Sequence, residues 1–250
     1  MTARRARLAR WVGLWAGLVM ACTEVVAGGL QVSPVTLSLQ PSQSADGIWL
    51  SNAGDTTLQA QVRVYHWVQS GGGEQLVPSR GLVISPPMLK LDPGERQLVR
   101  VIRAGPPPTG PGAGEDAYRL AIDELPLQTR GRRGLQFVLH YSIPIFILPA
   151  GAAATPPKLE WSLQREGNQV LLEVSNRGGT HAQLAGLAHV GPGGQRTEIS
   201  TGLLGYVLPG ATMRWALGPA GSALSGTGTL EAMVNGEKLA QTLAVADRTR

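Results

Sequence analysis

Short runs of alternating apolar and polar residues, broken by clusters of Gly and Pro, constrain the fold of this chain more than any other feature. The clearest run is 58–67, Leu-Gln-Ala-Gln-Val-Arg-Val-Tyr-His-Trp. Successive side chains of a strand point to opposite faces, so a period of two indicates half-buried antiparallel strands. Turn-forming sequences at 52–55, 70–73, 92–94 and 235–236 separate such runs. No long stretch has the 3.6-residue period of a helix, and we expect an all-β protein.

The segment 149–157, Pro-Ala-Gly-Ala-Ala-Ala-Thr-Pro-Pro, divides the chain because it combines small and rigid residues without an apolar period. Strand patterns precede it at 30–39, 45–52, 56–68, 81–89, 95–103, 116–125 and 134–148. They follow it at 158–164, 168–176, 181–190, 195–200, 203–208, 211–217 and 227–245. Each half has about the strand number of an immunoglobulin-like sandwich. We therefore expect two such domains, 28–149 and 158–250, joined by a linker at 150–157.

The first residues have the pattern of a secretory signal peptide. Four arginines lie within residues 4–10, and an apolar run at 11–21 follows them. That run is shorter than the about 20 residues of a transmembrane helix. Small residues at Val25 and Ala27 favour cleavage before Gly28, with a lipoprotein-type site at Cys22 as the alternative. We expect a signal peptide at 1–27 and export of the rest.

Charge and cysteine content narrow the classes of function. The formal net charge of +5 includes the four arginines of the signal peptide, so the mature chain is near neutral. It has no basic stripe interleaved with aromatic residues, and we expect no binding of nucleic acid. Cys22 is the only cysteine, and with cleavage before Gly28 it leaves with the signal peptide, so that the mature chain would have no disulfide and no thiol chemistry.

Motifs of catalysis and metal binding are missing from the sequence. It contains no Gly-x-Ser-x-Gly, His-Glu-x-x-His or Cys-x-x-Cys motif, and its four histidines are widely spaced. The glycine clusters at 71–73 and 191–194 are typical of turns. Asp123 and Glu124 are neighbours on a strand and would face opposite sides. We expect no enzyme, metal, cofactor or small-molecule substrate, and we interpret His66 and His140 as structural residues.

The run 135–149, Leu-Gln-Phe-Val-Leu-His-Tyr-Ser-Ile-Pro-Ile-Phe-Ile-Leu-Pro, is long for a strand and rich in β-forming residues. One face carries an apolar row of seven residues: Leu135, Phe137, Leu139, Tyr141, Ile143, Ile145 and Ile147. Its second half is apolar on both faces, which predicts burial on both sides. Pro144 has no backbone donor, so the strand is either an edge or interrupted there. An apolar edge strand suggests pairing with another chain; the alternative is an ordinary strand covered by the second sheet.

Several motifs occur in an order that resembles a known family. They are a Pro-Pro strand leading through a Pro-Gly turn into a Val-Arg strand at 84–101, the strand Tyr-Arg-Leu-Ala-Ile-Asp-Glu-Leu-Pro at 118–126, the opening strand at 33–39 and the run 135–149. This first half resembles the periplasmic chaperones of chaperone–usher pilus assembly. The second half is similar to them only in length and strand pattern.

The resemblance implies two immunoglobulin-like domains in a boomerang-like arrangement. It also implies that the last strand of the first domain completes the sandwich of a pilin subunit, by donor-strand complementation, before an outer-membrane usher receives the subunit. By position, the donor residues would be Leu135, Phe137, Leu139 and Tyr141. The same edge could pair between two copies of the chain. The alternative function is a structural or adhesive β-sandwich component of a secreted pilus.

The sequence departs from the classical members of that family at the anchor for the subunit's terminal carboxylate. The two positions that carry cations in the classical members are Leu37 or Ser38 and Pro144 in this sequence, and none of these is charged. The Ile-Pro-Ile-Phe pattern and Tyr118-Arg119 resemble the archaic, spore-coat-U-type branch more closely. Candidate anchors are Arg119 and Arg133. The alternatives are a pairing of Arg119 with Asp123 or Glu124, and a solvated loop for Arg133.

Overall fold

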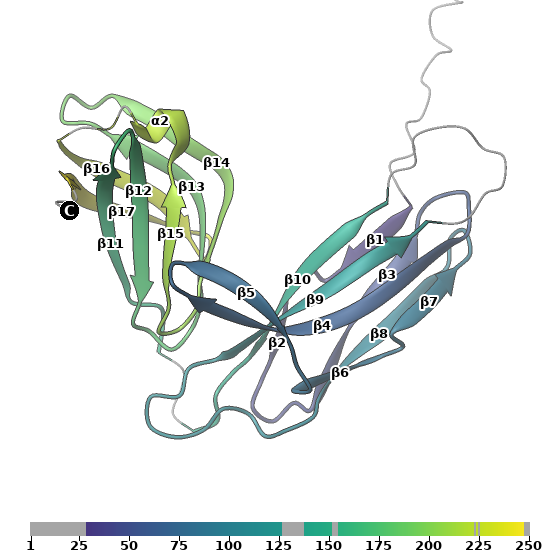
Figure 1. The fold of residues 1–250 in the computed structure, drawn as a ribbon. Coiled ribbons are helices and arrows are strands. Elements are labelled where there is room, and N and C mark those ends of the chain that lie inside the picture. Colours follow the sequence, from purple (N-terminus) through teal and green to yellow (C-terminus); the bar gives the residue numbers. More distant parts are fainter. Residues whose placement is uncertain (1–28, 127–137, 152–154, 223, 225, 248–250) are drawn as a thin grey trace, which may run out of the picture.

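A computed structural model describes residues 29–126, 138–151, 155–222, 224 and 226–247. The predicted signal peptide, Arg133, Leu135 and Phe137 lie outside these residues. The described chain is almost entirely β-structure in two sandwiches set at an angle, which gives the molecule a boomerang shape (Figure 1). The expected all-β class and the pair of sandwiches are thereby confirmed.

The first sandwich has two layers. One layer has four strands in the order β1 (Leu30–Ser33), β3 (Ala45–Asn52), β8 (Arg96–Arg103) and β6 (Leu82–Ser85). The other has the order β2 (Leu37–Leu39), β10 (His140–Ile147), β9 (Asp116–Leu125), β4 (Leu58–Ser70) and β5 (Gly73–Pro78), with β7 (Met88–Leu91) also paired to β4. Alternating residues of both layers fill a common core, among them Leu39, Ile48, Leu50, Leu91, Leu120 and Ile122.

Two of the expected strands are each divided between the layers. The pattern 30–39 forms β1 and β2, and 81–89 forms β6 and β7, with each break at a cis Ser-Pro bond before Pro34 or Pro86. A proline cannot donate to a ladder, so pairing ends there and the chain crosses to the other layer. The strand β5 was not predicted, because Glu-Gln-Leu-Val-Pro has no clear alternation and every residue of β5 is exposed.

The second sandwich is a continuous path of seven strands in the order β14 (Arg196–Val207), β13 (Ala182–Val190), β16 (Thr227–Val234), β17 (Glu237–Asp247), β11 (Leu159–Glu166), β12 (Gln169–Asn176) and β15 (Thr212–Ala216). The short helix α2 (Gly218–Ser222) follows β15. The path folds into two layers because β17 pairs antiparallel with β16 and then, near its end, parallel with β11. The expected strands 195–200 and 203–208 are one strand, β14, and 227–245 forms the hairpin β16–β17 around the predicted 235–236 turn.

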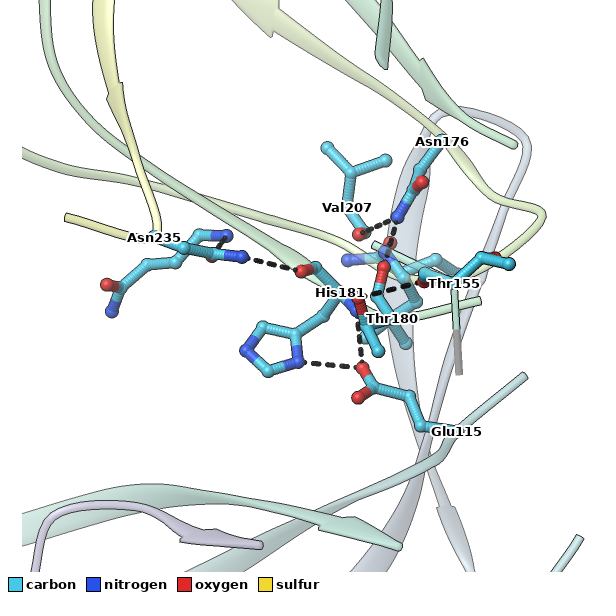
Figure 2. A network of polar contacts seen from close by, with 10 residues as sticks. Glu115, Thr155, Asn176, Thr180, His181, Val207 and Asn235 are labelled. Carbon is cyan, nitrogen blue, oxygen red and sulfur yellow. Dashed lines mark hydrogen bonds and ion pairs between the residues drawn. The ribbon is translucent and has the colours of Figure 1, made fainter. Parts of the chain in front are cut away.

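Both sandwiches contain the same corner, built on a Ser-Asn-x-Gly sequence at 51–54 and 175–178. Asn52 is 1% exposed; its amide donates to the carbonyl oxygens of Thr56 and Leu91, and its Oδ1 accepts from the amide of Gly54. Asn176, also 1% exposed, repeats these bonds in the second sandwich (Figure 2). Its amide donates to the carbonyl oxygens of Thr180 and Val207, and its Oδ1 accepts from the amides of Gly178 and Lys158. A buried asparagine therefore ties two strand ends together in each domain.

The two sandwiches share buried residues across their junction. Trp67, Ala117 and Phe146 belong to strands of the first sandwich but pack within the core of the second. The last strand of the first sandwich ends at Ile147 and the first of the second begins at Leu159. The exact domain limits, 28–149 and 158–250, stay a prediction. No helix of the described residues has the length and apolar character needed to cross a membrane.

Candidate functional site: an open edge strand and the interdomain cleft

The strand β10 is open along its first half and enclosed along its second. It pairs with β9 over its whole length, but with β2 only from Ile145 to Ile147. Among the described strands, none pairs with the edge of His140 to Pro144 that faces away from β9. The strand β1, which precedes β2 in the chain, lies in the other layer. Pro144 is thus the last residue before two-sided pairing begins. Residues 143–147 are all buried, as their two-sided apolar pattern predicted.

The described donor candidates lie at the start of this open edge. Leu139 and Tyr141 are half-buried and pack against the core of the first sandwich. Tyr141 Oη donates to the carbonyl of Leu30 at 2.7 Å. Glu124 Oε2 accepts from the backbone amide of Leu139 at 3.2 Å. Val138 has the opposite orientation in the sequence pattern and is 49% exposed. Leu135 and Phe137 lie outside the described residues, and the donor role of all four candidates stays a prediction.

An acidic side chain fastens the beginning of β10 to its neighbours. Asp123 of β9 lies 2.6 Å from His140 Nδ1 of β10 and 2.6 Å from Arg63 Nη2 of β4. Burial raises the pKa of Asp123, but the hydrogen bonds from Arg63 and His140 outweigh it and hold that pKa below its ordinary value of 3.8. His140 is therefore a structural residue, as predicted, and so is His66, which bonds Asp116 at 2.7 Å.

Arg119 projects from β9 into the cleft between the two sandwiches. Its guanidinium carbon lies 3.6 Å from the ring centre of Trp67 and 5.1 Å from that of Tyr206. Nη1 reaches the carbonyl of Ser142 at 3.4 Å. Burial lowers the pKa of Arg119, partly offset by Glu74 and Tyr206, yet an arginine remains charged at neutral pH. Among the described residues, no carboxylate lies within ion-pair distance of it.

The alternative pairing of Arg119 with Asp123 or Glu124 is wrong. Asp123 is occupied by Arg63 and His140, and Glu124 accepts from the backbone of Leu139. Arg119 instead stacks by its flat face on aromatic rings, which leaves N–H groups at its edge. Arg133, the other candidate, lies outside the described residues.

A buried carboxylate, that of Glu115, joins the two sandwiches through His181 (Figure 2). Glu115 precedes β9, and its side chain is 2% exposed. Its Oε1 accepts from both the backbone amide and Nδ1 of His181, at 2.6 and 2.7 Å. The His181 ring stacks on Phe146 of β10, with centroids 3.6 Å apart and planes 7° from parallel. The enclosed half of β10 is thereby in direct contact with the second sandwich.

The hairpin β4–β5 makes the second connection between the sandwiches, and Figure 1 shows its turn reaching β15. Gln69 donates from Nε2 to the carbonyl of Tyr206 at 2.9 Å and accepts at Oε1 from the amide of Leu208 at 2.8 Å. At the tip, the carbonyl of Gly72 accepts from the amide of Arg214 at 3.1 Å. The tip of the hairpin thus forms a backbone hydrogen bond with β15, which is an edge strand of the second sandwich.

Most residues of the interdomain cleft were not predicted from the sequence. Trp67, Gln69, Glu115, His181 and Tyr206 come from both domains, and only the structure brings them together. One available signal was Trp67 at the end of an alternating strand, followed by the glycine turn 70–73. Within the described part of the chain, no group of three His, Cys, Asp or Glu side chains is arranged to hold a metal ion.

Fold and site define a class: a two-domain immunoglobulin-like β-sandwich protein, with an edge strand that is open at one end and enters an interdomain cleft at the other. The chain belongs to the family of pili and flagellar-assembly chaperones, because the family's PapD N-terminal domain matches residues 29–153, half of the 250 residues. The expected family is therefore confirmed.

Two curated relatives and a solved structure are similar to the chain. The probable fimbrial chaperone LpfB of Escherichia coli O157:H7 is 25% identical over 155 residues, which cover 60% of this chain and 63% of the relative. The chaperone protein PmfD of Proteus mirabilis (strain HI4320) is 22% identical over 160 residues, 62% of this chain and 61% of the relative. The matches thus span somewhat less than two thirds of these relatives.

The solved structure is the chaperone–tip adhesion subunit pre-assembly complex CsuC–CsuE, from archaic Csu pili of Acinetobacter baumannii. One of its chains is 23% identical, with a TM-score of 0.67, and the match covers 88% of this chain and 99% of that one. This similarity supports the two-domain fold.

Proposed function

We propose that the chain is a periplasmic chaperone that binds pilin subunits by lending them the open edge of β10 and then delivers them to an outer-membrane usher. The observation that carries the proposal is the one-sided pairing of His140 to Pro144, next to an alternating apolar row. An incomplete pilin has the complementary defects, namely a hydrophobic groove and an unpaired backbone. One added strand satisfies both. The same chain then acts by binding and not by catalysis.

The energetics suit such a complex. A fully buried large apolar side chain contributes about 1.5–3 kcal/mol. The four candidates Leu135, Phe137, Leu139 and Tyr141 would together offset the cost of ordering the strand and its partner. Leu139 and Tyr141 contribute less than the full value, because they are already half-buried against the first sandwich. Tyr141 is held in the unbound chain by its bond to Leu30, so we place it at the base of the donor segment. The similarity to a fold from an archaic pilus system, and the motif Tyr118-Arg119, favour the archaic branch.

The donor strand is tested by co-expression with a pilin subunit of the same organism, followed by co-purification from the periplasm. Phe137→Asp places a charge in the proposed groove, and we expect the subunit to be lost from the purified complex. Val138→Asp is the matched control, since Val138 is already 49% exposed and belongs to the other face. Leu139→Asp is a second variant whose own folding is checked by thermal melting, because Leu139 packs on the chaperone core. A subunit retained by Phe137→Asp and the folded Leu139→Asp protein would overturn the donor-strand role.

We also propose Arg119 as the anchor for the terminal carboxylate of the subunit. It is a half-buried cation with no carboxylate partner among the described residues, at the junction of the sandwiches where the enclosed half of β10 also lies. A charge-assisted hydrogen bond contributes about 1.5–3 kcal/mol, which corresponds to about a tenfold to hundredfold change in affinity. Arg119→Ala should therefore weaken subunit binding by that factor. Arg96→Ala is the matched control, because Arg96 also stacks on a tryptophan, Trp49, but on the outer face of the first sandwich.

Arg133 remains the second proposed anchor. Its alanine variant is measured beside Arg119→Ala, and unchanged binding in both variants would remove the arginine anchor altogether.

A further inference from the structure

The guanidinium of Arg119 is held by rings from both domains. Trp67 belongs to β4 of the first sandwich and Tyr206 to β14 of the second, and their centroids lie 5.3 Å apart at 79°. A cation over an aromatic face is attracted by the ring's electron density, and more strongly where water is excluded. Trp67 is 1% and Tyr206 8% exposed, so both rings are shielded. The position of Arg119 therefore depends on how the two domains are placed.

The rings of Trp67 and Tyr206 are each held by a hydrogen bond within their own domain. Trp67 Nε1 donates to Glu74 Oε2 at 2.9 Å, within the β4–β5 hairpin. Tyr206 Oη accepts from Gln183 Nε2 at 2.8 Å, within the second sandwich. Gln69 then joins the two supports, because its side chain bonds the backbone on both sides of Val207. The hairpin that carries Trp67 thus also fixes the strand that carries Tyr206.

Stacking determines which part of Arg119 meets a ligand. The guanidinium lies over the ring of Trp67, and among the described residues its N–H groups make one hydrogen bond, the long 3.4 Å contact to the carbonyl of Ser142. A guanidinium held by its face presents two parallel N–H groups, which is the geometry that a carboxylate accepts. Without the second ring, the same side chain would sample more rotamers and lose entropy on binding.

We propose that Tyr206 is a positioning residue for Arg119, so that the second domain takes part in capturing the subunit's terminal carboxylate and the Gln69 contact links that capture to the interdomain angle. The inference rests on the proposed anchor role of Arg119. It gives the second domain a role in subunit binding, namely the positioning of Arg119, in addition to the role of the donor strand of the first domain.

The experiment uses the full mature chain and the pilin subunit of the co-expression test, prepared in two forms. One has its natural terminal carboxylate, and the other has a terminal amide introduced by ligation of a synthetic peptide. Affinities are measured for both forms with the variants Tyr206→Leu, Tyr206→Phe and Gln69→Ala. We expect Tyr206→Leu and Gln69→Ala to weaken binding of the carboxylate form about tenfold and to leave the amide form unchanged. Tyr206→Phe keeps the ring and should bind like the unaltered chain.

The outcomes separate the two proposals. If Arg119→Ala changes neither affinity, the anchor is wrong and the role of Tyr206 falls with it. If Arg119→Ala weakens only the carboxylate form while Tyr206→Leu and Gln69→Ala have no effect, the anchor stands and the positioning role is wrong. Equal weakening of both subunit forms by Tyr206→Leu would show a merely structural role. In the Arg119→Ala background, Tyr206→Leu should cause no further loss. Should Tyr206→Leu fail to fold, Gln69→Ala decides alone.

Discussion

At the scale of single residues, the buried asparagines of the two corners have the largest structural role for their size. Asn52 bonds three backbone groups and Asn176 four, all of them buried or part-buried. Removing one amide leaves buried donors and acceptors unpaired, at a cost of about 1–3 kcal/mol for each such group. We expect Asn52→Ala to lower the unfolding free energy of the first sandwich, and Asn176→Ala that of the second, by at least this much.

Denaturant unfolding followed by tryptophan fluorescence measures the effect, since each sandwich contains two tryptophans: Trp49 and Trp67, and Trp161 and Trp215. Asn168→Ala is the control, because Asn168 is an exposed turn residue. If the buried and exposed variants were equally stable, the corner bonds would have no net stabilising effect.

The burial and role of a residue could be predicted from the sequence where a single strand determined its environment. The burial of Ile143 to Ile147 and the structural role of His140 follow from alternation and position alone. The stacking of Arg119 did not, because Trp67 and Tyr206 belong to different domains and their meeting depends on the interdomain angle. A sequence pattern describes the faces of a strand, but not the face that another domain will cover.

At the scale of elements, the pairing at the start of β10 depends on the carboxylate of Asp123. The pKa of Asp123 is lower in the folded chain than the ordinary 3.8, because the hydrogen bonds from Arg63 and His140 outweigh the opposing effect of burial. A lowered carboxyl pKa adds stability at pH values above the unfolded value, and this stability is lost as the pH falls through the folded value. The contribution of Asp123 should therefore be complete above about pH 5 and decline below pH 3.8.

Urea unfolding of the unaltered chain and of Asp123→Asn, at a series of pH values, measures this contribution. The difference between the two proteins should be constant between pH 5 and 6 and vanish in stronger acid. Asp55→Asn, at an exposed loop position, is the control. A difference that persisted at pH 2 would contradict an ionic origin.

The β4–β5 turn offers a second test at this scale, because two adjacent glycines share a backbone conformation but not an environment. Gly71 and Gly72 have φ of 63° and 85°, values that other residues rarely adopt. A Cβ at Gly72 would lie 3.0 Å from Arg214 Cδ, whereas one at Gly71 would have no neighbour within 4 Å. We expect Gly72→Val to separate the hairpin from the second sandwich, and Gly71→Val to cost only backbone strain.

Spin labels on cysteines introduced at Met88 and Leu203, both exposed and in different domains, report the interdomain distance distribution. It should broaden for Gly72→Val and stay narrow for Gly71→Val. Identical distributions in the two variants would show that the bridge from Gly72 to Arg214 does not hold the domains.

Element boundaries were the least predictable part of the fold. The patterns at 30–39 and 81–89 are continuous in sequence, yet Pro34 and Pro86 divide them between layers. A proline marks an interruption in a pattern, but the direction in which the chain continues depends on which layer offers a partner. The edge strand β5 was missed for the related reason that an exposed edge needs no apolar alternation.

At the scale of the whole molecule, β10 connects the proposed binding edge to the domain junction. Its first half is open to another chain, and its second half places Phe146 in the core of the other sandwich. A subunit that pairs with the open half therefore lies next to the cleft that holds Arg119. One strand can contribute to both the proposed donor edge and the proposed anchor site because it runs from the open edge of the first sandwich into the junction with the second.

We expect the angle between the two sandwiches to depend on the contact between Glu115 and His181. The Glu115 side chain is 2% exposed, and among the described residues its carboxylate accepts hydrogen bonds only from the backbone amide and Nδ1 of His181. His181→Ala removes the imidazole and the stack on Phe146, leaving the carboxylate with one partner. Hydrogen bonds to charged groups contribute about 1.5–3 kcal/mol, so the variant should be destabilised by this order, and the two domains should unfold in separate steps.

The double variant Glu115→Gln with His181→Ala separates charge from packing. An amide is less costly to bury than an unpaired carboxylate, so the double variant should recover part of the stability lost by His181→Ala. Scanning calorimetry of both proteins measures the difference, with Glu160→Gln as control because Glu160 and its partner Arg177 are exposed. If the double variant were no more stable than His181→Ala, the junction would depend on the stacked ring alone, and the buried carboxylate would have no part in holding the two domains at their angle.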